Sequence, residues 1–204
     1  RFPRGSTTER HHKHPIHPLI PPKSLLSKTG ILGVRNVSVT KAQSSDLPKS
    51  LLANSNFADW TDGLPSDWTV EVGAKNGAEA PKSEVKQVDS GLSLRGTGST
   101  MAWHSVSQSP SLDGGSAYRL VFQARSANVR RQGRQHDNCY VGVMIFDANG
   151  ERLGMSIKDL SRNSSWRRHR IEFKVPANAD KTEVIVFLSK TGTLTVKNLL
   201  LTKL

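Results

Sequence analysis

Residues 138–154 read NCYVGVMIFDANGERLG, two short runs joined by an Asn-Gly pair. In the first run every second residue is apolar, which is the period of a β-strand with one face against a core. The apolar residues of this set are Cys139, Val141, Val143 and Ile145. An Asn-Gly pair between alternating runs is the strongest short-range signal for a β-hairpin, because both residues readily adopt positive φ. The stretch therefore predicts two antiparallel strands joined by a tight turn.

The same pattern recurs from residue 53 to the end of the chain. Short alternating runs are separated by Gly, Asn, Asp, Ser and Pro clusters, and no stretch shows a sustained apolar stripe with the helical period. We expect strands near residues 68–73, 84–88, 91–96, 99–107, 117–125, 138–147, 151–158, 166–175, 182–189 and 193–202. Many short antiparallel strands at this spacing predict an all-β fold, a two-sheet antiparallel β-sandwich or jelly roll.

Residues 1–52 differ in composition from the predicted sandwich, which spans residues 53–204. They are rich in Pro, Ser, Lys and His and carry nine Lys and Arg against two acids, a net charge of +7 within the +12 of the whole chain. We predict a disordered basic tail or linker here. Such a tail either attracts nucleic acid, acidic polysaccharide or anionic lipid, or it serves solubility without a specific partner. The prolines in HHKHPIHP (11–18) favour an extended, solvated chain, so we expect no metal site there.

Targeting and membrane signals are weak in this sequence. No apolar run reaches the roughly 18 residues that a membrane span needs. Residues 23–45 begin basic and have a weakly apolar middle that Lys28 and Arg35 interrupt, so they make no clear signal peptide. The single cysteine, Cys139, allows no intrachain disulfide and does not indicate a compartment.

Alternation also predicts which side chains leave the core. A pyranose stacks its apolar face on an aromatic ring, and its hydroxyls bond to Arg, Asn and Gln. We expect Trp103 and Tyr140 to be platforms on the solvent face of one sheet, with Gln123, Arg125 and Asn138 as polar partners. The alternative is that the two aromatic side chains only pack against the surface of the sheet, since aromatic residues are common on strands.

The connection SANVRRQGRQHDN (126–138) is rich in arginine. Arginine forks pair with sulfate or carboxylate oxygens through two hydrogen bonds. If this loop lies at the rim of the sandwich, Arg130 and Arg134 indicate an anionic polysaccharide. The alternative is a solvated basic loop with no specific ligand.

Four segments in order resemble the galactose-binding-domain-like jelly rolls, in particular carbohydrate-binding modules related to families 4, 9 and 22. They are NSNFADWTDGLPSDW (54–68), LSLRGTGSTMAWHSVSQSPSLDGGSAYRLVFQAR (92–125), VGVMIFDANGERLG (141–154) and WRRHRIEFKVPANADKTEVIVFLSKTGTLTVKNLLL (166–201). The resemblance implies a non-catalytic module of two antiparallel sheets that binds a glycan on a concave sheet face or at rim loops. Such modules are usually attached to secreted glycoside hydrolases or lyases, which implies an extracellular or periplasmic location. Trp166 matches a structural tryptophan of the family, so we expect it to pack in the core or at a sheet edge.

The resemblance also bears on calcium. In many relatives the last strand begins with an Asp-Asp pair that helps to bind a structural calcium ion, and the matching residues here are Lys197-Asn198. Calcium prefers hard oxygen ligands with net negative charge. A structural calcium is therefore possible but disfavoured, and we expect no other cofactor or metal.

No catalytic signature accompanies the predicted fold. The chain has no GxSxG or HExxH motif, and most of its acidic residues lie in turn-forming contexts. We expect a non-enzymatic polysaccharide-binding module, with an anionic glycan as the finer hypothesis. The alternatives are a β-sandwich protein-interaction domain and a polyanion- or nucleic-acid-binding domain. Nucleic acid is disfavoured, because the basic residues are scattered and not interleaved with aromatic ones.

The stretch NSNFADWTDGLPSDW itself combines two tryptophans with three acids, as many sugar-binding sites do. We interpret it instead as the opening segment of the domain. Gly63-Leu64-Pro65 makes a turn, Asp62 and Asp67 serve turn geometry, and Trp68 packs where its strand begins.

Overall fold

The computed structural model describes residues 48–204, except for 75–83, 90, 98–101, 130–138 and 190. The chain divides into two units, residues 1–41 and 42–204, and the described residues belong to the second. Residues 1–47 of the predicted basic tail, including its histidine-rich stretch, lie outside the described residues. Most of the arginine-rich loop also lies outside them.

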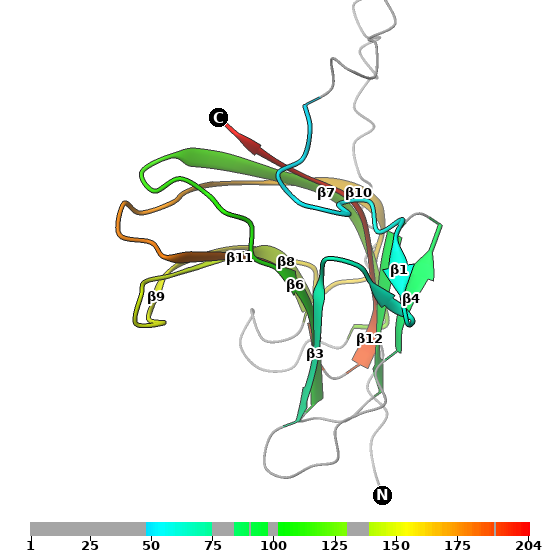
Figure 1. The fold of residues 1–204 in the computed structure, drawn as a ribbon. Helices are drawn as coiled ribbons and strands as arrows, with labels where there is room; N and C mark the ends of the chain where they lie inside the picture. The colour runs from blue at the N-terminus through cyan, green and yellow to red at the C-terminus, as the bar shows by residue number, and fades with distance from the viewer. Residues whose placement is uncertain (1–47, 75–83, 90, 98–101, 130–138, 190) are drawn as a thin grey trace, which may run out of the picture. The chain divides into compact units, whose positions relative to one another are not determined.

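Ten strands form two antiparallel sheets of five (Figure 1). One sheet has the order β10 (Ser164–Lys174), β7 (Ala117–Ala127), β12 (Thr191–Lys203), β5 (Gly91–Thr97), β4 (Glu84–Val88). The other has the order β3 (Thr69–Ala74), β6 (Ala102–Gln108), β11 (Lys181–Ser189), β8 (Cys139–Phe146), β9 (Arg152–Asp159). Two short strands, β1 (Trp60–Thr61) and β2 (Leu64–Pro65), pair with each other.

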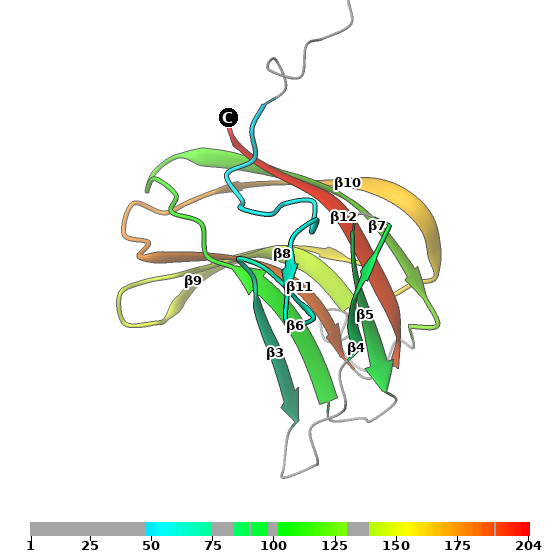
Figure 2. The ribbon, with the colours of Figure 1, turned by 45° about the vertical axis from the view of Figure 1, so that its right-hand side comes forward.

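The two sheets pack face to face and bend together (Figure 2). The β3-β6-β11-β8-β9 sheet lies on the inside of the bend, and we call it the concave sheet. The β10-β7-β12-β5-β4 sheet lies on the outside, and we call it the convex sheet. The predicted all-β sandwich is therefore confirmed, and all ten predicted strands are present with ends close to those expected.

The core lies between the sheets and is made of the side chains that alternation assigned to it. The predicted inward residues of β8, Cys139, Val141, Val143 and Ile145, are all buried. The same alternation buries Tyr118, Leu120, Phe122 and Ala124 on β7, and Ile171, Phe173 and Val175 at β10. Each β-strand alternates faces at every residue, so the intervening side chains point to solvent. None of the described residues forms a helix that could cross a membrane.

The turn between β8 and β9 is the predicted hairpin. Asp147 Oδ1 accepts hydrogen bonds from the backbone N–H groups of Asn149 (2.9 Å) and Glu151 (2.8 Å), and Gly150 has a φ of 79°. Only a residue without Cβ adopts this backbone conformation at little cost. The Asp147 carboxylate thus shapes the turn, as expected for an acid in this context.

The domain begins earlier than the boundary predicted at residue 53. Leu51 N donates to Leu201 O (2.9 Å), and Leu52 is buried in the core. Leu199 N donates to Ser55 O (3.0 Å). Because β5 begins at Gly91, opposite Lys197, it does not reach the last part of β12, and these residues pair there instead.

Candidate functional site

The solvent face of the concave sheet carries a group of aromatic side chains. Strand register places Gly73 of β3 opposite Trp103 of β6, and Phe187 of β11 opposite Tyr140 of β8. All of these positions alternate with core residues, as His104 and Leu188 illustrate. The aromatic residues therefore belong to the solvent face of the concave sheet, which forms the inside of the bend (Figure 2).

The indole of Trp103 lies against the backbone of Gly73. A Cβ built at position 73 would overlap Cε2 and Cζ2 of the indole and would lie 2.5 Å from its Nε1. A glycine at this position is therefore what allows the Trp103 ring to approach β3 so closely. Trp103 is half-buried, so part of its ring is accessible to a ligand.

Phe187 continues this group across the sheet. Its ring is nearly parallel to that of Trp103, with centroids 6.2 Å apart and planes inclined by 20°. The Tyr140 ring lies 4.7 Å from Phe187 with planes inclined by 16°, which is an offset-stacked pair. The three rings thus form one aromatic row over β6, β11 and β8.

The accessible part of this row differs from the expectation. Tyr140 points away from the core, as predicted, but it is only 7% exposed. Trp103 and the half-buried Phe187 provide the surface that a ligand can reach. Phe187 was not among the predicted site residues, although alternation in EVIVFLS (183–189) assigns it to the solvent face once Val184, Val186 and Leu188 are assigned to the core.

Acceptor groups surround the aromatic row. Glu71 of β3 is exposed and pairs in register with Ser105, while Asp159 of β9 pairs with Tyr140. Glu183 of β11 forms an ion pair of 4.0 Å with Lys181. Carboxylates and hydroxyls at these positions can accept hydrogen bonds from sugar hydroxyl groups.

Gln123 and Arg125 do not lie beside the aromatic row. Both belong to β7 in the convex sheet, where they alternate with the buried Phe122 and Ala124 and point to the opposite side of the sandwich. The prediction that they share one sheet face with Trp103 and Tyr140 is therefore wrong. Each face was assigned correctly within its own strand, but alternation does not reveal which sheet a strand joins.

The remaining predicted site residues, Arg130, Arg134 and Asn138, lie outside the described residues.

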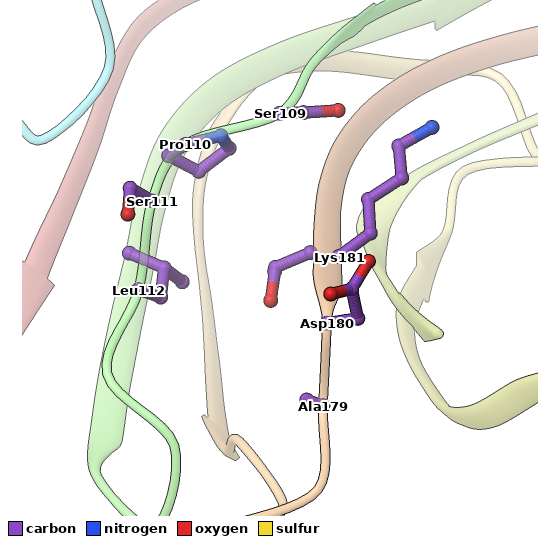
Figure 3. Close-up of a pocket in the computed structure, with 8 residues that line it drawn as sticks. Ser109, Pro110, Ser111, Leu112, Ala179, Asp180 and Lys181 are labelled. Carbon is purple, nitrogen blue, oxygen red and sulfur yellow. The ribbon is translucent and has the colours of Figure 1, made fainter. Parts of the chain in front are cut away.

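A pocket also opens at one end of the sandwich, where the segment after β6 meets the start of β11 (Figure 3). It has a volume of about 260 Å³ and is lined by Ser109, Pro110, Ser111, Leu112, Ala179, Asp180, Lys181 and Thr182. In Figure 3 the Asp180 carboxylate and the Lys181 side chain come from neighbouring residues where β11 begins. This rim pocket has polar groups but no aromatic ring in its lining, so it lacks a surface on which a pyranose could stack.

The opening segment is held by N–H donors. Asn54 Nδ2 donates to the carbonyl oxygens of Asp59 (2.7 Å) and Ser66 (2.8 Å), and Trp68 Nε1 donates to Asn54 O (3.3 Å). Gln87 Nε2 donates to Ala58 O (3.1 Å). Calcium would need several oxygen ligands with negative charge.

The resemblance also matches Lys197-Asn198 to the acidic pair that helps to bind calcium in relatives. Lys197 Nζ lies 4.4 Å from the centroid of the Trp166 ring. A lysine side chain supplies no oxygen ligand, which calcium requires. The residues present therefore do not suit a calcium ion, and the opening segment is stabilised by hydrogen bonds and by the stacking of the buried Phe57 and Trp68, whose ring centroids are 4.9 Å apart.

Two titratable residues of the core, Cys139 and His104, take no part in the candidate site. Burial raises the pKa of the Cys139 thiol, so it stays protonated and unreactive. Burial lowers the pKa of His104, whose two ring nitrogens have no hydrogen-bond partner among the described residues. Both side chains point between the sheets and cannot touch a ligand on the solvent face.

Comparisons with known proteins bear on the fold. No family model and no curated protein matches the sequence. Among solved structures, the enzymatically active domain of tailspike protein 4 from bacteriophage CBA120 aligns with a TM-score of 0.57 at 14% identity, over 76% of this chain and 21% of that one. A carbohydrate-binding module of family 4 aligns with a TM-score of 0.50 at 15% identity, over 75% of this chain and 99% of that one.

These likenesses establish the fold. The chain spans about a fifth of the length of the tailspike structure and nearly the full length of the family 4 module. The jelly-roll fold that the resemblance implies is thereby confirmed.

Proposed function

We propose that the protein is a non-catalytic polysaccharide-binding module, and that a neutral glycan binds on the concave sheet over Trp103 and Phe187. The observation that carries the proposal is the placement of the half-buried Trp103 ring on Gly73, nearly parallel to Phe187, on the inside of the bend. The fold supports it, because one solved structure of similar fold is described as a carbohydrate-binding module.

The chemistry of a pyranose fits this surface. Its apolar C–H face stacks on an aromatic ring, and such contacts contribute about 0.5–1.5 kcal/mol beyond the burial of area. Its hydroxyls then bond to acceptors such as Glu71 and Asp159 on the flanking strands. Because the rings are already positioned by packing, little conformational entropy is lost on binding.

Charge favours a neutral glycan at this face. Among the described residues the solvent side of the concave sheet carries the carboxylates Glu71, Glu183 and Asp159 and two cations, Lys181, which is paired to Glu183, and Arg152, which lies opposite Phe146 at the far end of β8 from Tyr140. An acidic polysaccharide would meet carboxylates close to the aromatic row and would be repelled. The anionic glycan expected from the arginine-rich loop is therefore not proposed for the concave face.

Binding without catalysis is the simplest use of this surface. Glycoside hydrolysis needs two carboxyl groups that flank the scissile bond at roughly 5–10 Å from each other. Glu71, Glu183 and Asp159 belong to three different strands, β3, β11 and β9. Two of them already have partners, since Asp159 Oδ1 accepts a hydrogen bond from Ser161 N (2.9 Å) and Glu183 is paired to Lys181. We further propose that the module acts outside the cytoplasm, attached to or associated with a carbohydrate-active enzyme.

Affinity electrophoresis tests the proposal. The full chain is run in gels that contain neutral polysaccharides (β-glucan, xylan, mannan, galactan), together with Phe187→Ala and Leu64→Ala. We expect at least one polysaccharide to retard the wild type, and Phe187→Ala to abolish the retardation. Leu64, which is 47% exposed on the separate β1–β2 hairpin, is the control, and its substitution should change nothing.

Two results would contradict the proposal. Retardation by none of the neutral polysaccharides would favour the alternative of a protein-interaction domain. Release of reducing ends from a retarding polysaccharide would show catalysis and would overturn the non-catalytic part.

A further inference from the structure

The solvent face of the convex sheet is strongly basic over three strands. Register places the outward side chains of β10, β7 and β12 side by side on the outside of the bend (Figure 2). The basic residues of this face are Arg119, Arg125, Arg168, Arg170, Lys174 and Lys197, and its one acid on these strands is Glu172. We call this surface the basic face.

Trp166 holds two of these cations together. Arg125 Cζ lies 5.0 Å and Lys197 Nζ lies 4.4 Å from the centroid of the Trp166 ring. Each contact is a cation–π interaction, which fixes the position of a long side chain. Two like charges that share one ring repel each other, and an anion placed between them would relieve the repulsion.

Arg168 extends this cluster to the edge of the sheet. It lies opposite Gln123 of β7, which in turn lies opposite Lys197 of β12. Adjacent strands are about 4.8 Å apart, so the three side chains form a row across the sheet. The row combines two cations with an amide that can donate to an oxygen.

The only acid of the basic face neutralises other arginines. Glu172 Oε1 forms ion pairs with Arg119 (2.7 Å) and Arg170 (2.8 Å). Within the part of the chain that the structure describes, no carboxylate forms an ion pair with Arg125, Arg168 or Lys197. These three cations are therefore available to an external anion.

A groove runs beside this cationic row. It has a volume of about 560 Å³, and its lining includes the aliphatic Val121 and Leu200 and the cationic Arg119, Arg168 and Arg170. Val121 and Leu200 pair in register, so they lie next to each other in the groove. Of its three guanidinium groups only that of Arg168 forms no ion pair among the described residues, and an apolar strip beside it suits a sugar ring that carries a carboxylate or a sulfate.

We propose that the basic face is a second ligand site, selective for an acidic polysaccharide whose carboxylates or sulfates bind Arg125, Arg168 and Lys197. It is separate from the neutral-glycan site, because the two surfaces lie on opposite sides of the sandwich. Nucleic acid fits less well, since single strands bind by stacking bases on exposed rings and Trp166 already has two cations over its ring. Two of the residues predicted from sequence to bind sugar, Gln123 and Arg125, belong to this face.

Binding of defined polyanions tests this site. The full chain is titrated with polygalacturonate, which carries only carboxylates, and with dextran sulfate, which carries only sulfates, each at two salt concentrations; dextran is the neutral control. The test variant is Arg125→Gln/Arg168→Gln/Lys197→Gln. The matched control is Arg152→Gln, which removes an exposed arginine from β9 of the concave sheet.

We expect the triple variant to bind at least one of the two polyanions about tenfold or more weakly than the wild type, because charge-assisted hydrogen bonds are lost. Arg152→Gln and Trp103→Ala should stay within about twofold of the wild type, since they leave the basic face intact. Arg168→Gln alone, an exposed substitution, should weaken binding in the same direction and serves as the readout if the triple variant does not fold. The polyanion that depends on the three residues identifies carboxylate or sulfate as the recognised group.

Two outcomes would overturn the proposal. Polyanion binding that is equal in the wild type and the Arg168→Gln and triple variants would assign the charge effect to other basic parts of the chain, such as residues 1–52. Equal affinity for an oligo(dT) strand or for phosphatidylserine vesicles, with the same dependence on the three residues, would show a general polyanion surface without selectivity for a polysaccharide. Loss of neutral-glycan binding in Trp103→Ala, with polyanion binding retained, would in turn distinguish the two sites.

Discussion

Trp103 and Gly73 depend on each other across two neighbouring strands. The indole occupies the space that any side chain at position 73 would need, since a Cβ there would lie 2.5 Å from Nε1. The strand that carries the glycine thus determines how the ring is presented. This relationship makes the geometry of the proposed glycan site testable without altering the aromatic residue itself.

Gly73→Ala should reduce glycan binding by moving Trp103. The new methyl group would force the indole off β3, and we expect an affinity loss of about five- to tenfold for the glycan that the wild type binds, which corresponds to the stacking energy of one ring. Isothermal titration calorimetry measures it. The control is Gly154→Ala on β9, where the nearest atom, Ile145 Cδ1, would be 3.9 Å from the new Cβ. Unchanged affinity in Gly73→Ala would show that the ring position does not matter.

His104→Leu should stabilise the protein. His104 is 1% exposed, and both its ring nitrogens are buried without a partner among the described residues. An unsatisfied buried polar group costs about 1–3 kcal/mol, which the leucine would recover. Urea unfolding of both proteins at pH 7.5 measures the difference in the free energy of unfolding.

The stabilisation of His104→Leu relative to the wild type should increase at acidic pH, because the pKa of His104 is lowered in the folded protein. Burial lowers the pKa of His104 below the ordinary value of 6.5, so the unfolded chain takes up a proton before the folded one does. The wild type therefore loses stability as the pH falls from about 6.5 towards the folded pKa, by up to about 1.4 kcal/mol per pH unit from this residue. Unfolding at pH 5.5 should show a wider gap between the variant and the wild type than at pH 7.5. A gap that narrows in acid would contradict this account of His104.

Asn54→Ala should destabilise the opening segment. The side chain donates to the carbonyls of Asp59 and Ser66 and accepts from Asp59 N (3.1 Å), and its φ of 41° is one that asparagine tolerates better than alanine. We expect a loss of about 2–4 kcal/mol in the free energy of unfolding. Asn56→Ala is the control, because Asn56 is exposed and accepts one bond of 3.3 Å from Ala58 N.

A chelator tests whether calcium stabilises the opening segment. If N–H donors hold the opening segment in place of a metal ion, a chelator should leave the Tm of the wild type unchanged. A Tm that falls with chelator and rises again with added calcium would show that an ion stabilises the segment after all.

Alternation in single strands was enough to predict most of the fold. It identified the ten strands and the buried sets, because a period of two is decided by neighbouring residues alone. The β8–β9 turn could also be predicted, since an Asn-Gly pair such as Asn149-Gly150 favours the backbone conformation of a tight turn. The short strands β1 and β2 were not predicted, because two residues show no period.

The composition of the sites could not be obtained in the same way. Trp103 and Arg125 were each assigned correctly to a solvent face, yet β6 and β7 join different sheets and so point them to opposite sides. The pairing of strands that are far apart in sequence decides this, and no local pattern encodes it. The contact of Trp103 with Gly73, which lies thirty positions away in sequence, was invisible for the same reason.

The central claim is that a neutral glycan binds over Trp103 on the concave sheet, and the four tryptophan indoles report on it directly. The ¹H–¹⁵N spectrum of the full chain is recorded during titration with an oligosaccharide of the glycan that retards the wild type, with the indole signals assigned by substitution. We predict saturable shifts of the Trp103 indole signal, while those of Trp60 and Trp68, which donate to backbone carbonyls of the opening segment, and of Trp166 on the convex sheet stay in place. Saturable shifts at Trp166 with an unmoved Trp103 would contradict the claim.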